Sequence, residues 1–322
     1  MRYIPDNLGI TVIVTAFNRH SYVIMALQSV IRQKREQDQI ILLKNFGNEE
    51  HVEDFCNLNN IEFYTPEIDS VGEWYAFGIQ KSVNNIISFL DDDDLFLDGK
   101  LDYVSNEFAK GDVICLRNRL YGSPARYLVI DRNWGKKEVK ALHPSYRGMA
   151  SIKNELLTNR SALSFSKAFL VSILDKIKPM TTMCEEIILI DLALESRSGK
   201  CIFSDFVGTW WYVHYSVSHL RTPEEKVKAG LITLASYNYA YSVLRSPMLK
   251  HHIQRSIRTA RFRLSMSRDD SPSTIFRRWF DLFIAYPFST LTWIMAYDMV
   301  KHIGNKSNKV IPLYGQVFTD PP

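Results

Sequence analysis

The chain is predicted to adopt an α/β fold, with a mostly parallel sheet flanked by helices and a helical appendage at the C-terminal side. Two observations predict this. Short β-branched runs alternate with segments of helical periodicity over the first ninety residues, which is typical of right-handed β-α-β units. After Thr222-Pro223 the pattern changes to long helical stretches without strand-like runs. We therefore expect two domains, residues 1–222 and residues 223–322.

Four apolar runs in the front half have the length and composition of buried strands. They are Ile10–Phe17, Gln39–Leu43, Ile61–Tyr64 and Ile86–Leu90. Helical spacing separates them, over about residues Val23–Gln33, His51–Leu58 and Val71–Ser82. Ligands of such sheets bind beyond the carboxyl ends of the parallel strands. We therefore expect the polar residues that follow these strands to meet at one edge.

The fourth apolar run ends in four consecutive carboxylates, Asp91–Asp94, within the sequence NIISFLDDDDLFL. Adjacent carboxylates repel one another, and the apolar flanks cannot solvate them. Oxygen ligands suit Mg²⁺ or Mn²⁺, which are commonly shared with a bound phosphate. The alternative is a solvated polar turn. The metal site is favoured because Thr15–Arg19 and Asn45 also lie at strand ends.

The distribution of charge and the cysteines give expectations about the compartment and the partners of the protein. The whole chain carries a net charge of +4, yet Lys226 to Lys309 holds fourteen Lys and Arg against four Asp. The four cysteines lack metal-site spacing and are expected to be reduced thiols. The sequence MRYIPDNLGI has no apolar signal region, so we expect a cytoplasmic protein. No nucleic-acid-binding motif accompanies the basic residues, so no nucleic acid partner is expected.

Three segments, TVIVTAFNR, ALQSVIRQ and SFLDDDD, resemble the family 2 glycosyltransferases in their order and spacing. The resemblance covers about residues 8–220. It implies the GT-A fold, whose Rossmann-like sheet binds a nucleotide sugar. It also implies an inverting, metal-dependent transfer of a sugar from a nucleotide-diphosphate sugar to an acceptor hydroxyl or phosphate.

Carried over position by position, the resemblance places the donor nucleotide at the end of the first strand. The nucleotide-sugar-binding residues that it implies there are Thr15, Ala16, Phe17, Asn18 and Arg19. The backbone of this segment would hold the base, with the Phe17 ring near it or, alternatively, packed in the core. Arg19 would contact the diphosphate, and the alternative is a solvated residue at a helix N-terminus.

The acidic run completes the donor site that the resemblance implies. Asp91 would accept a hydrogen bond from the ribose, Asp92 would lie beside it, and Asp93 would bind Mn²⁺ or Mg²⁺. Metal and protein would stabilise the charge that develops on the leaving nucleoside diphosphate. His214, which follows Trp210-Trp211-Tyr212-Val213, would contact the metal or a phosphate, unless its role is structural.

The sequence departs from the family pattern at two places. The family's Asp-Asp-Gly-Ser after the second strand is replaced by Lys44-Asn45-Phe46-Gly47. Asn45 can still accept and donate a hydrogen bond to the base, and a UDP-sugar is favoured, with GDP- and dTDP-sugars as alternatives. The family's Ala-Arg-Asn before a Gly becomes Tyr75-Ala76-Phe77-Gly78, so an expected arginine is absent. Arg19 is the candidate to replace it.

The catalytic base is expected at Glu185-Glu186, which precede an apolar helical stretch and Gly199. Inverting transfer needs a carboxylate that takes the proton from the attacking hydroxyl. The second acid matches the family's base, so Glu186 would be the base and Glu185 would bind or orient the acceptor. The alternative is that both acids only serve the N-terminus of a helix, where negative charge is favourable.

The back third offers a second surface. Leu282–Tyr297 is uncharged but interrupted by Pro287, and its helical length of about 24 Å falls short of a hydrocarbon core of roughly 30 Å. Aromatic residues beside basic helices fit a peripheral contact with anionic lipid. The acceptor would then be a polyprenyl-phosphate-linked glycan, and otherwise another glycan. The alternatives are packing on the catalytic domain or a homo-oligomer interface.

The alternative hypothesis for the whole chain is a protein without catalytic activity. The missing arginine and the altered Lys44-Asn45 would then mark a nucleotide-sugar-binding or assembly subunit of a glycan-synthesis complex. The intact acidic run and the Glu185-Glu186 pair argue against this alternative. We therefore expect an active glycosyltransferase.

Overall fold

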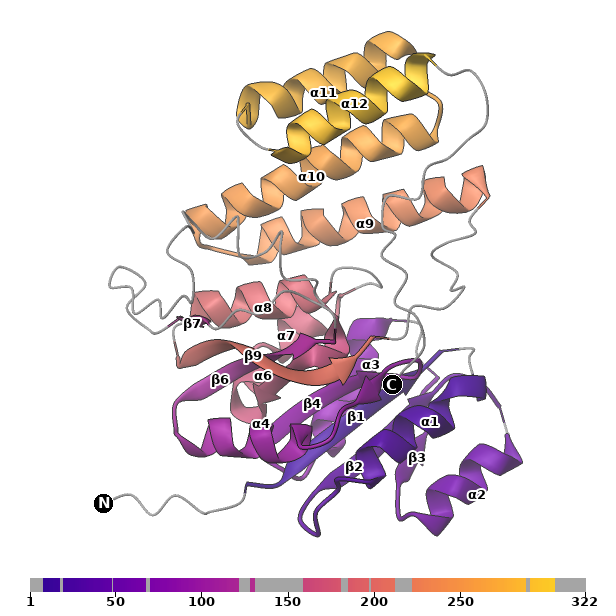
Figure 1. Cartoon of the computed structure of the whole chain (residues 1–322), viewed down its shortest axis with the longest axis vertical. Coiled ribbons are helices and arrows are strands. Elements are labelled where there is room, and N and C mark those ends of the chain that lie inside the picture. The colour runs from indigo at the N-terminus through magenta and orange to yellow at the C-terminus, as the bar shows by residue number, and fades with distance from the viewer. Residues whose placement is uncertain are drawn as a thin grey trace. The chain divides into compact units, whose positions relative to one another are not determined.

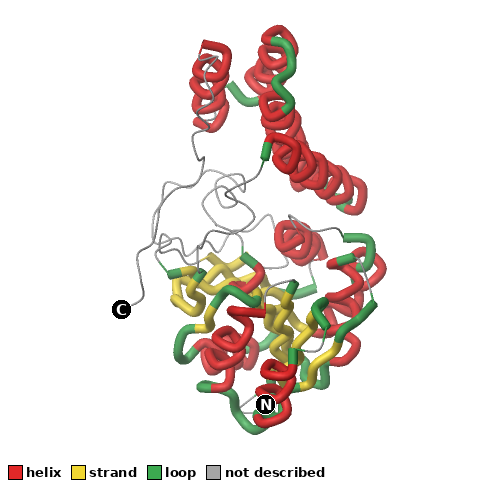
Figure 2. The backbone as a smooth tube through the Cα atoms, turned by 90° about the vertical axis from the view of Figure 1, so that its right-hand side faces the viewer, coloured by secondary structure: helices red, strands yellow, loops and turns green. Residues whose placement is uncertain are grey.

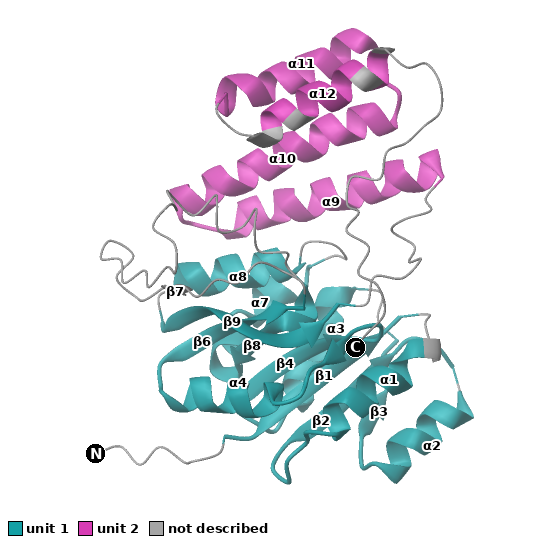
Figure 3. Cartoon of the chain, viewed as in Figure 1, with its two compact units in different colours: residues 1–180, 185–212 teal, residues 181–184, 213–322 magenta. Residues whose placement is uncertain are grey.

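The computed structural model describes most of the chain, which divides into two compact units (Figure 3). Unit 1 comprises Met1–Met180 and Glu185–Tyr212, and unit 2 comprises Thr181–Cys184 and Val213–Pro322. The described residues are 8–17, 20–47, 49–67, 70–121, 128–130, 159–180, 185–196, 198–211, 222–287 and 290–304.

Unit 1 is built on a mixed sheet (Figure 1). Its strands are β1 Ile10–Ala16, β2 Gln39–Lys44, β3 Glu62–Tyr64, β4 Ile86–Asp91, β5 Leu95–Phe96, β6 Val113–Leu120, β7 Leu128–Ile130, β8 Leu163–Ser166 and β9 Lys200–Trp210. The order across the sheet is β3-β2-β1-β4-β8-β6-β9-β5, with β7 paired to β9. The strands β3, β2, β1 and β4 are parallel, as the alternating sequence pattern predicts, whereas β8 is antiparallel to both of its neighbours.

Helices cover both faces of this sheet (Figure 2). They are α1 His20–Ile31, α2 Glu50–Leu58, α3 Val71–Lys81, α4 Lys100–Ala109, α6 Lys167–Ser172, α7 Leu174–Ile177 and α8 Glu185–Ser196, with a 3₁₀ turn, η1, at Arg160–Ala162. On one face Val12 and Val14 of β1 join a core that α1, α2 and α4 complete. On the other face Ile13 lies against Gly78 of α3. The alternation of side chains along β1 therefore buries both faces, which explains its uninterrupted apolar sequence.

The carboxyl ends of the three central parallel strands are level with one another. Thr15 of β1 pairs with Asp91 of β4, and Ala16 pairs with Lys44 of β2. The Asn45 N–H then donates to the Ala16 carbonyl over 3.2 Å. The chain segments that follow β1, β2 and β4 therefore leave the sheet at one edge, as expected for a ligand site of an α/β sheet.

Unit 2 is helical, with α9 Pro223–Val243, α10 Pro247–Ser267, α11 Pro272–Ala285 and α12 Thr290–Gly304. The first three helices begin with a hydroxyl cap followed by proline, at Thr222, Ser246 and Ser271, which is a strong helix start. A small core forms between α10, α11 and α12 from Phe262, Ile275, Leu282, Met295 and Met299.

The apolar stretch 282–297 is divided between two helices, because α11 ends at Ala285 and α12 begins at Thr290. Pro287 lies between them, where the sequence predicted an interruption. Within the described ranges of the chain, no helix combines the length and the apolar character that crossing a membrane requires.

We predict that Gly72→Ala destabilises unit 1 by about 1–3 kcal/mol, because the backbone at Gly72 packs so closely against residues 177–180 that an added methyl group has no room. The Gly72 N–H donates to the Met180 carbonyl over 3.1 Å, and a Cβ at Gly72 would lie 2.0 Å from the Ile177 carbonyl oxygen. Gly47→Ala is the matched control, since its Cβ would meet nothing within 4 Å. Urea unfolding measures both variants, and equal midpoints would contradict this packing.

Candidate functional site

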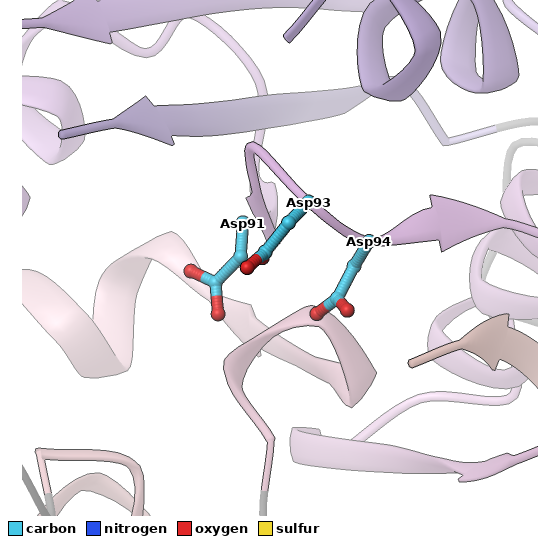
Figure 4. Close-up of side chains that lie close together, drawn as sticks. All are labelled: Asp91, Asp93 and Asp94. Atoms are coloured by element: carbon cyan, nitrogen blue, oxygen red, sulfur yellow. The ribbon is translucent and has the colours of Figure 1, made fainter. Parts of the chain in front are cut away.

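The acidic run lies in the turn between β4 and β5. Asp91 is the last residue of β4, and the Asp94 N–H donates back to the Asp91 carbonyl over 3.2 Å. Carboxylate oxygens of Asp91, Asp93 and Asp94 lie within 4.8 Å of one another (Figure 4). Asp92 is buried, and its Oδ2 accepts a hydrogen bond from the Phe17 N–H over 3.2 Å. Three acids therefore form a cluster, and the fourth ties the turn to the end of β1.

The turn Asn159–Ser161 holds this acidic cluster from the side of β8. Asn159 Nδ2 donates to Asp94 Oδ2 over 2.8 Å, and the Ser161 hydroxyl donates to the same oxygen over 2.5 Å. Ser161 Oγ also accepts the Asp91 N–H over 2.9 Å. The Asn159 side chain in turn caps the 3₁₀ turn by accepting the Ser161 N–H. One short turn thus fixes both ends of the acidic run.

Arg160, the middle residue of this turn, links the acidic cluster to α8. Its Nη2 lies 2.5 Å from Asp91 Oδ1, and its Nη1 lies 2.8 Å from Glu185 Oε1. Nη1 also donates to the Tyr75 hydroxyl over 2.5 Å. Tyr75 is buried in the middle of α3, so the guanidinium has a fixed aromatic neighbour. A single side chain therefore touches an acid of the β4 end and an acid of the expected catalytic pair.

A buried lysine of α4 contacts the same turn. Lys100 Nζ donates to the Ser161 carbonyl and, over 3.0 Å, to Thr209 Oγ1, and it lies 3.4 Å from the centre of the Phe96 ring. Burial lowers the Lys100 pKa well below its usual value, and the nearby Asp94 carboxylate acts in the opposite direction. The position of the acidic run therefore depends on contacts from β9 and α4 as well.

The acids themselves are electrostatically strained. Burial raises the pKa of Asp91, which the Arg160 guanidinium partly offsets and the Asp93 carboxylate reinforces. Burial also raises the pKa of Asp94 well above its usual value, with Asp91 and Asp93 adding to the effect. Such a cluster of hard oxygen donors is what Mg²⁺ or Mn²⁺ binds. The donor set therefore fits a divalent cation.

The expected catalytic pair lies at the N-terminus of α8. Glu185 is buried and ion-paired to Arg160, and its second oxygen, Oε2, has no hydrogen-bond partner within the part of the chain that the structure describes. Burial, reinforced by the Glu185 carboxylate, raises the pKa of Glu186 from 4.5 to about 8. A carboxylate with a pKa in this range is a strong proton acceptor at neutral to alkaline pH. The arrangement therefore suits general-base chemistry.

The end of β1 contributes an exposed aromatic ring. Phe17 is 57% exposed, and its ring centre lies 6.2 Å from that of Trp74 on α3. Phe17 is therefore not packed in the core, while Thr15 is half-buried and Ala16 is buried. Of the residues expected to bind the donor or metal, Asn18, Arg19 and His214 lie outside the described residues.

Sequence reasoning missed five residues that the structure brings to this cluster, namely Tyr75, Asp94, Asn159, Arg160 and Ser161. Asp94 was part of the acidic run, and only its separate role was unassigned. Ser161 and Arg160 lie about seventy residues from Asp91 along the chain, and no local pattern in residues 159–165 (NRSALSF) marks them as partners of the acids. Only the pairing of β8 beside β4 brings them together.

Comparisons with known proteins agree with this geometry. The model of the family described as glycosyl transferase family 2 matches residues 11–176. A Rickettsia bellii (strain RML369-C) protein described as an uncharacterized glycosyltransferase is 31% identical over 97 residues. That alignment covers 29% of this chain and spans 14% of the relative's length. The family match confirms the resemblance seen in the sequence.

Solved structures of similar fold include two that contain a nucleotide sugar. Staphylococcus aureus TarS (residues 1–349) with UDP-GlcNAc has a TM-score of 0.58 at 13% identity, over 92% of this chain and 89% of that one. The mannosyltransferase PcManGT of Pyrobaculum calidifontis with GDP-Man and Mn²⁺ has a TM-score of 0.56 at 11% identity, over 92% and 86%. At such identities the likeness shows the fold, and it confirms the expected GT-A architecture.

We predict that Ser161→Ala destabilises the protein by about 1–3 kcal/mol, since it removes a donor to buried Asp94 and an acceptor for the Asp91 N–H. The loss should be smaller in acid. The pKa of Asp94 is raised by burial, so a fall in pH protonates this carboxyl in the folded state and removes its need for the donor.

Chemical unfolding between pH 4 and pH 8 measures this effect. Ser172→Ala is the control, because that hydroxyl donates only to the Phe169 carbonyl in its own helix, and its small effect should not vary with pH. A pH-independent loss in Ser161→Ala would contradict the role assigned to this hydroxyl.

Proposed function

The chain belongs to glycosyl transferase family 2, and from that premise we propose that it is an inverting, metal-dependent enzyme. It transfers a sugar from a nucleotide-diphosphate sugar to an acceptor hydroxyl or phosphate, and residues 1–222 form its catalytic domain. The observation that carries the proposal is that the Arg160 guanidinium contacts both Asp91 of the acidic cluster and Glu185 of the expected catalytic pair.

The donor would lie across the carboxyl ends of β1, β2 and β4. The exposed Phe17 ring offers a face for the base, Asn45 offers an amide, and Asp91 offers a ribose contact. UDP-sugars remain the favoured donors, with GDP- and dTDP-sugars as alternatives, because the amide of Asn45 can both donate and accept. Arg19 and Asn18, in the segment that follows, would complete this side of the site.

Asp93 would be the principal metal ligand, with Asp91 and Asp94 as the other carboxylates within reach. Bound Mn²⁺ or Mg²⁺ would act as a Lewis acid toward the diphosphate leaving group. His214 is proposed as a further metal or phosphate contact on the basis of the family resemblance. The role of the protein itself is to present these oxygens in a turn that the Asn159–Ser161 segment holds in place.

Glu186 would take the proton from the acceptor hydroxyl. Its position in the first turn of α8 places it next to Glu185, whose Oε1 is held by Arg160. We propose that Glu185 Oε2, a buried atom without a hydrogen-bond partner among the described residues, orients the acceptor. Attack on the face of the sugar opposite the diphosphate breaks the bond to the leaving oxygen and inverts the anomeric centre. The negative charge leaves with the nucleoside diphosphate.

The pH dependence of the reaction tests the proposed base. Glu186 must be ionised to accept a proton, and its pKa is about 8, so kcat/KM should rise about tenfold per pH unit below pH 8 and level off above it. Glu186→Gln should abolish transfer while donor binding persists. A proton NMR spectrum of the product should show the inverted anomer.

The same group gives a second readout that needs no acceptor. The folded pKa of about 8 exceeds the ordinary value of 4.5, so the folded state retains a proton that the unfolded chain releases. Stability should therefore fall between about pH 4.5 and pH 8, by at most about 1.4 kcal/mol per pH unit. Glu186→Gln should remove this fall, and an identical pH profile in the variant would contradict the raised pKa.

We propose further that the enzyme works at an anionic membrane surface, on a lipid-linked acceptor such as a polyprenyl-phosphate-linked glycan. The support comes from unit 2. Phe276 and Phe280 of α11 and Trp293 of α12 are 50%, 43% and 55% exposed, and Phe283 joins the rings of Phe280 and Trp293. Arg277 and Arg278 are exposed on α11. Aromatic rings beside arginine suit the interfacial region of a bilayer.

Vesicle sedimentation tests this surface. The protein should bind phosphatidylglycerol vesicles and release them as salt rises, with weak binding to phosphatidylcholine alone. Phe280→Glu and Trp293→Glu should each weaken binding at least tenfold, whereas Leu58→Glu should not, although Leu58 is also exposed, at 83%. Absence of vesicle binding would contradict the proposal, and self-association lost in the same variants would assign the surface to a homo-oligomer instead.

A further inference from the structure

Arg160 is the cation that bridges the two acidic segments of the site. It lies between the acid that ends β4 and the acid that begins α8, 2.5 Å from Asp91 Oδ1 and 2.8 Å from Glu185 Oε1. Its side chain is 21% exposed, compared with 17% for Asp91 and 7% for Glu185. These ion pairs are shielded from water, so the loss of one partner should cost more free energy than it does in a surface ion pair.

Asp91 has two potential cationic partners. It is already paired with Arg160, and it is one of the three carboxylates that could hold a divalent cation. Without Arg160, the buried carboxylates of Asp91 and Glu185 would lose their shared counter-charge, which would leave uncompensated charge in the interior. With Arg160 in place, a divalent cation that recruits Asp91 must share that carboxylate with the guanidinium.

Arg160 is also held by contacts that do not involve Asp91. The Tyr75 hydroxyl accepts from Nη1 over 2.5 Å, and Tyr75 is a buried residue of α3. Tyr75 also stands in the segment where the family pattern has its arginine. The backbone of Arg160 lies in the 3₁₀ turn whose other side chains hold Asp94. The guanidinium is therefore held independently of Asp91.

We propose that Arg160 is the internal counter-cation of the site and a positioning residue for the reaction. It neutralises Asp91 and holds Glu185 when no divalent cation is bound. It yields Asp91 when the cation and the nucleoside diphosphate enter together, and its freed N–H groups then bind the diphosphate, because guanidinium suits phosphate oxygens. This inference rests on the proposed function, because it assumes that the acidic cluster binds a divalent cation and a nucleotide.

The proposal predicts two changes of opposite sign in Arg160→Gln. Mn²⁺ alone should bind about tenfold more tightly, since the competing guanidinium is gone, which is within the range of coupling between sites. UDP at saturating Mn²⁺ should bind about tenfold more weakly, since the diphosphate loses a donor. Titration calorimetry with Mn²⁺ and with UDP measures both. Loss of structure alone would weaken both ligands, so it cannot produce this signature.

Three further variants complete the test. Arg160→Lys retains the charge but cannot span both acids, so it should fall between wild type and Arg160→Gln for both ligands. Tyr75→Phe should shift both affinities in the direction of Arg160→Gln, by a smaller factor. Arg35→Gln is the matched control, since Arg35 pairs with Asp38 near the start of β1, and both affinities should stay within twofold of wild type.

The outcomes separate the two proposals. If the wild-type chain binds neither Mn²⁺ nor any of UDP, GDP and dTDP, the proposed function fails. If wild type binds both and Arg160→Gln, folded by circular dichroism, binds Mn²⁺ no more tightly, the counter-cation role is wrong while the proposed function stands. Unchanged UDP binding in Arg160→Gln would overturn the diphosphate contact.

Discussion

The site depends on one constraint, which is that four consecutive carboxylates must be held at the end of a buried strand. Such charges are costly next to an apolar core unless each has a partner. The protein meets the constraint with unrelated groups, including an N–H from the end of β1 and the hydroxyl, amide and guanidinium of one short turn. Burial still raises the pKa of Asp91 and Asp94. A divalent cation bound between these carboxylates would relieve their remaining repulsion.

This constraint connects the two sides of the chemistry. The turn that holds the acidic run carries Arg160, and Arg160 holds Glu185 next to the proposed base. The binding of a donor and the placement of the acceptor base are therefore expected to be coupled through one residue. The same turn lies on Lys100, whose amine reaches the Ser161 carbonyl from α4. Elements from across unit 1, among them β1, β4, η1, α4 and α8, therefore contribute to the site, although its acids come from two short segments.

Local patterns in the sequence were sufficient for the fold and for the acids. The β-branched runs predicted the parallel strands β1 to β4, and the acidic run predicted that carboxylates gather at the end of β4, because each signal lies within a few adjacent residues. The partners of the acids could not be predicted in this way. Ser161 contacts Asp94 from 67 residues away, and Arg160 contacts Tyr75 from 85 residues away. These contacts follow from the antiparallel insertion of β8 beside β4, which has no local signature. The arginine expected in α3 is absent from the sequence, and Arg160 of η1 contacts Tyr75 of that helix.

Calorimetric titration of the purified chain with UDP-, GDP- and dTDP-sugars, in Mn²⁺ and again in chelator, tests the central claim most directly. We expect that one nucleotide class binds, that its binding needs the cation, and that Asp93→Ala abolishes this binding without unfolding the protein. Equal binding in chelator, or binding that survives Asp93→Ala, would contradict the claim that the carboxylates at the end of β4 hold a metal for a nucleotide sugar.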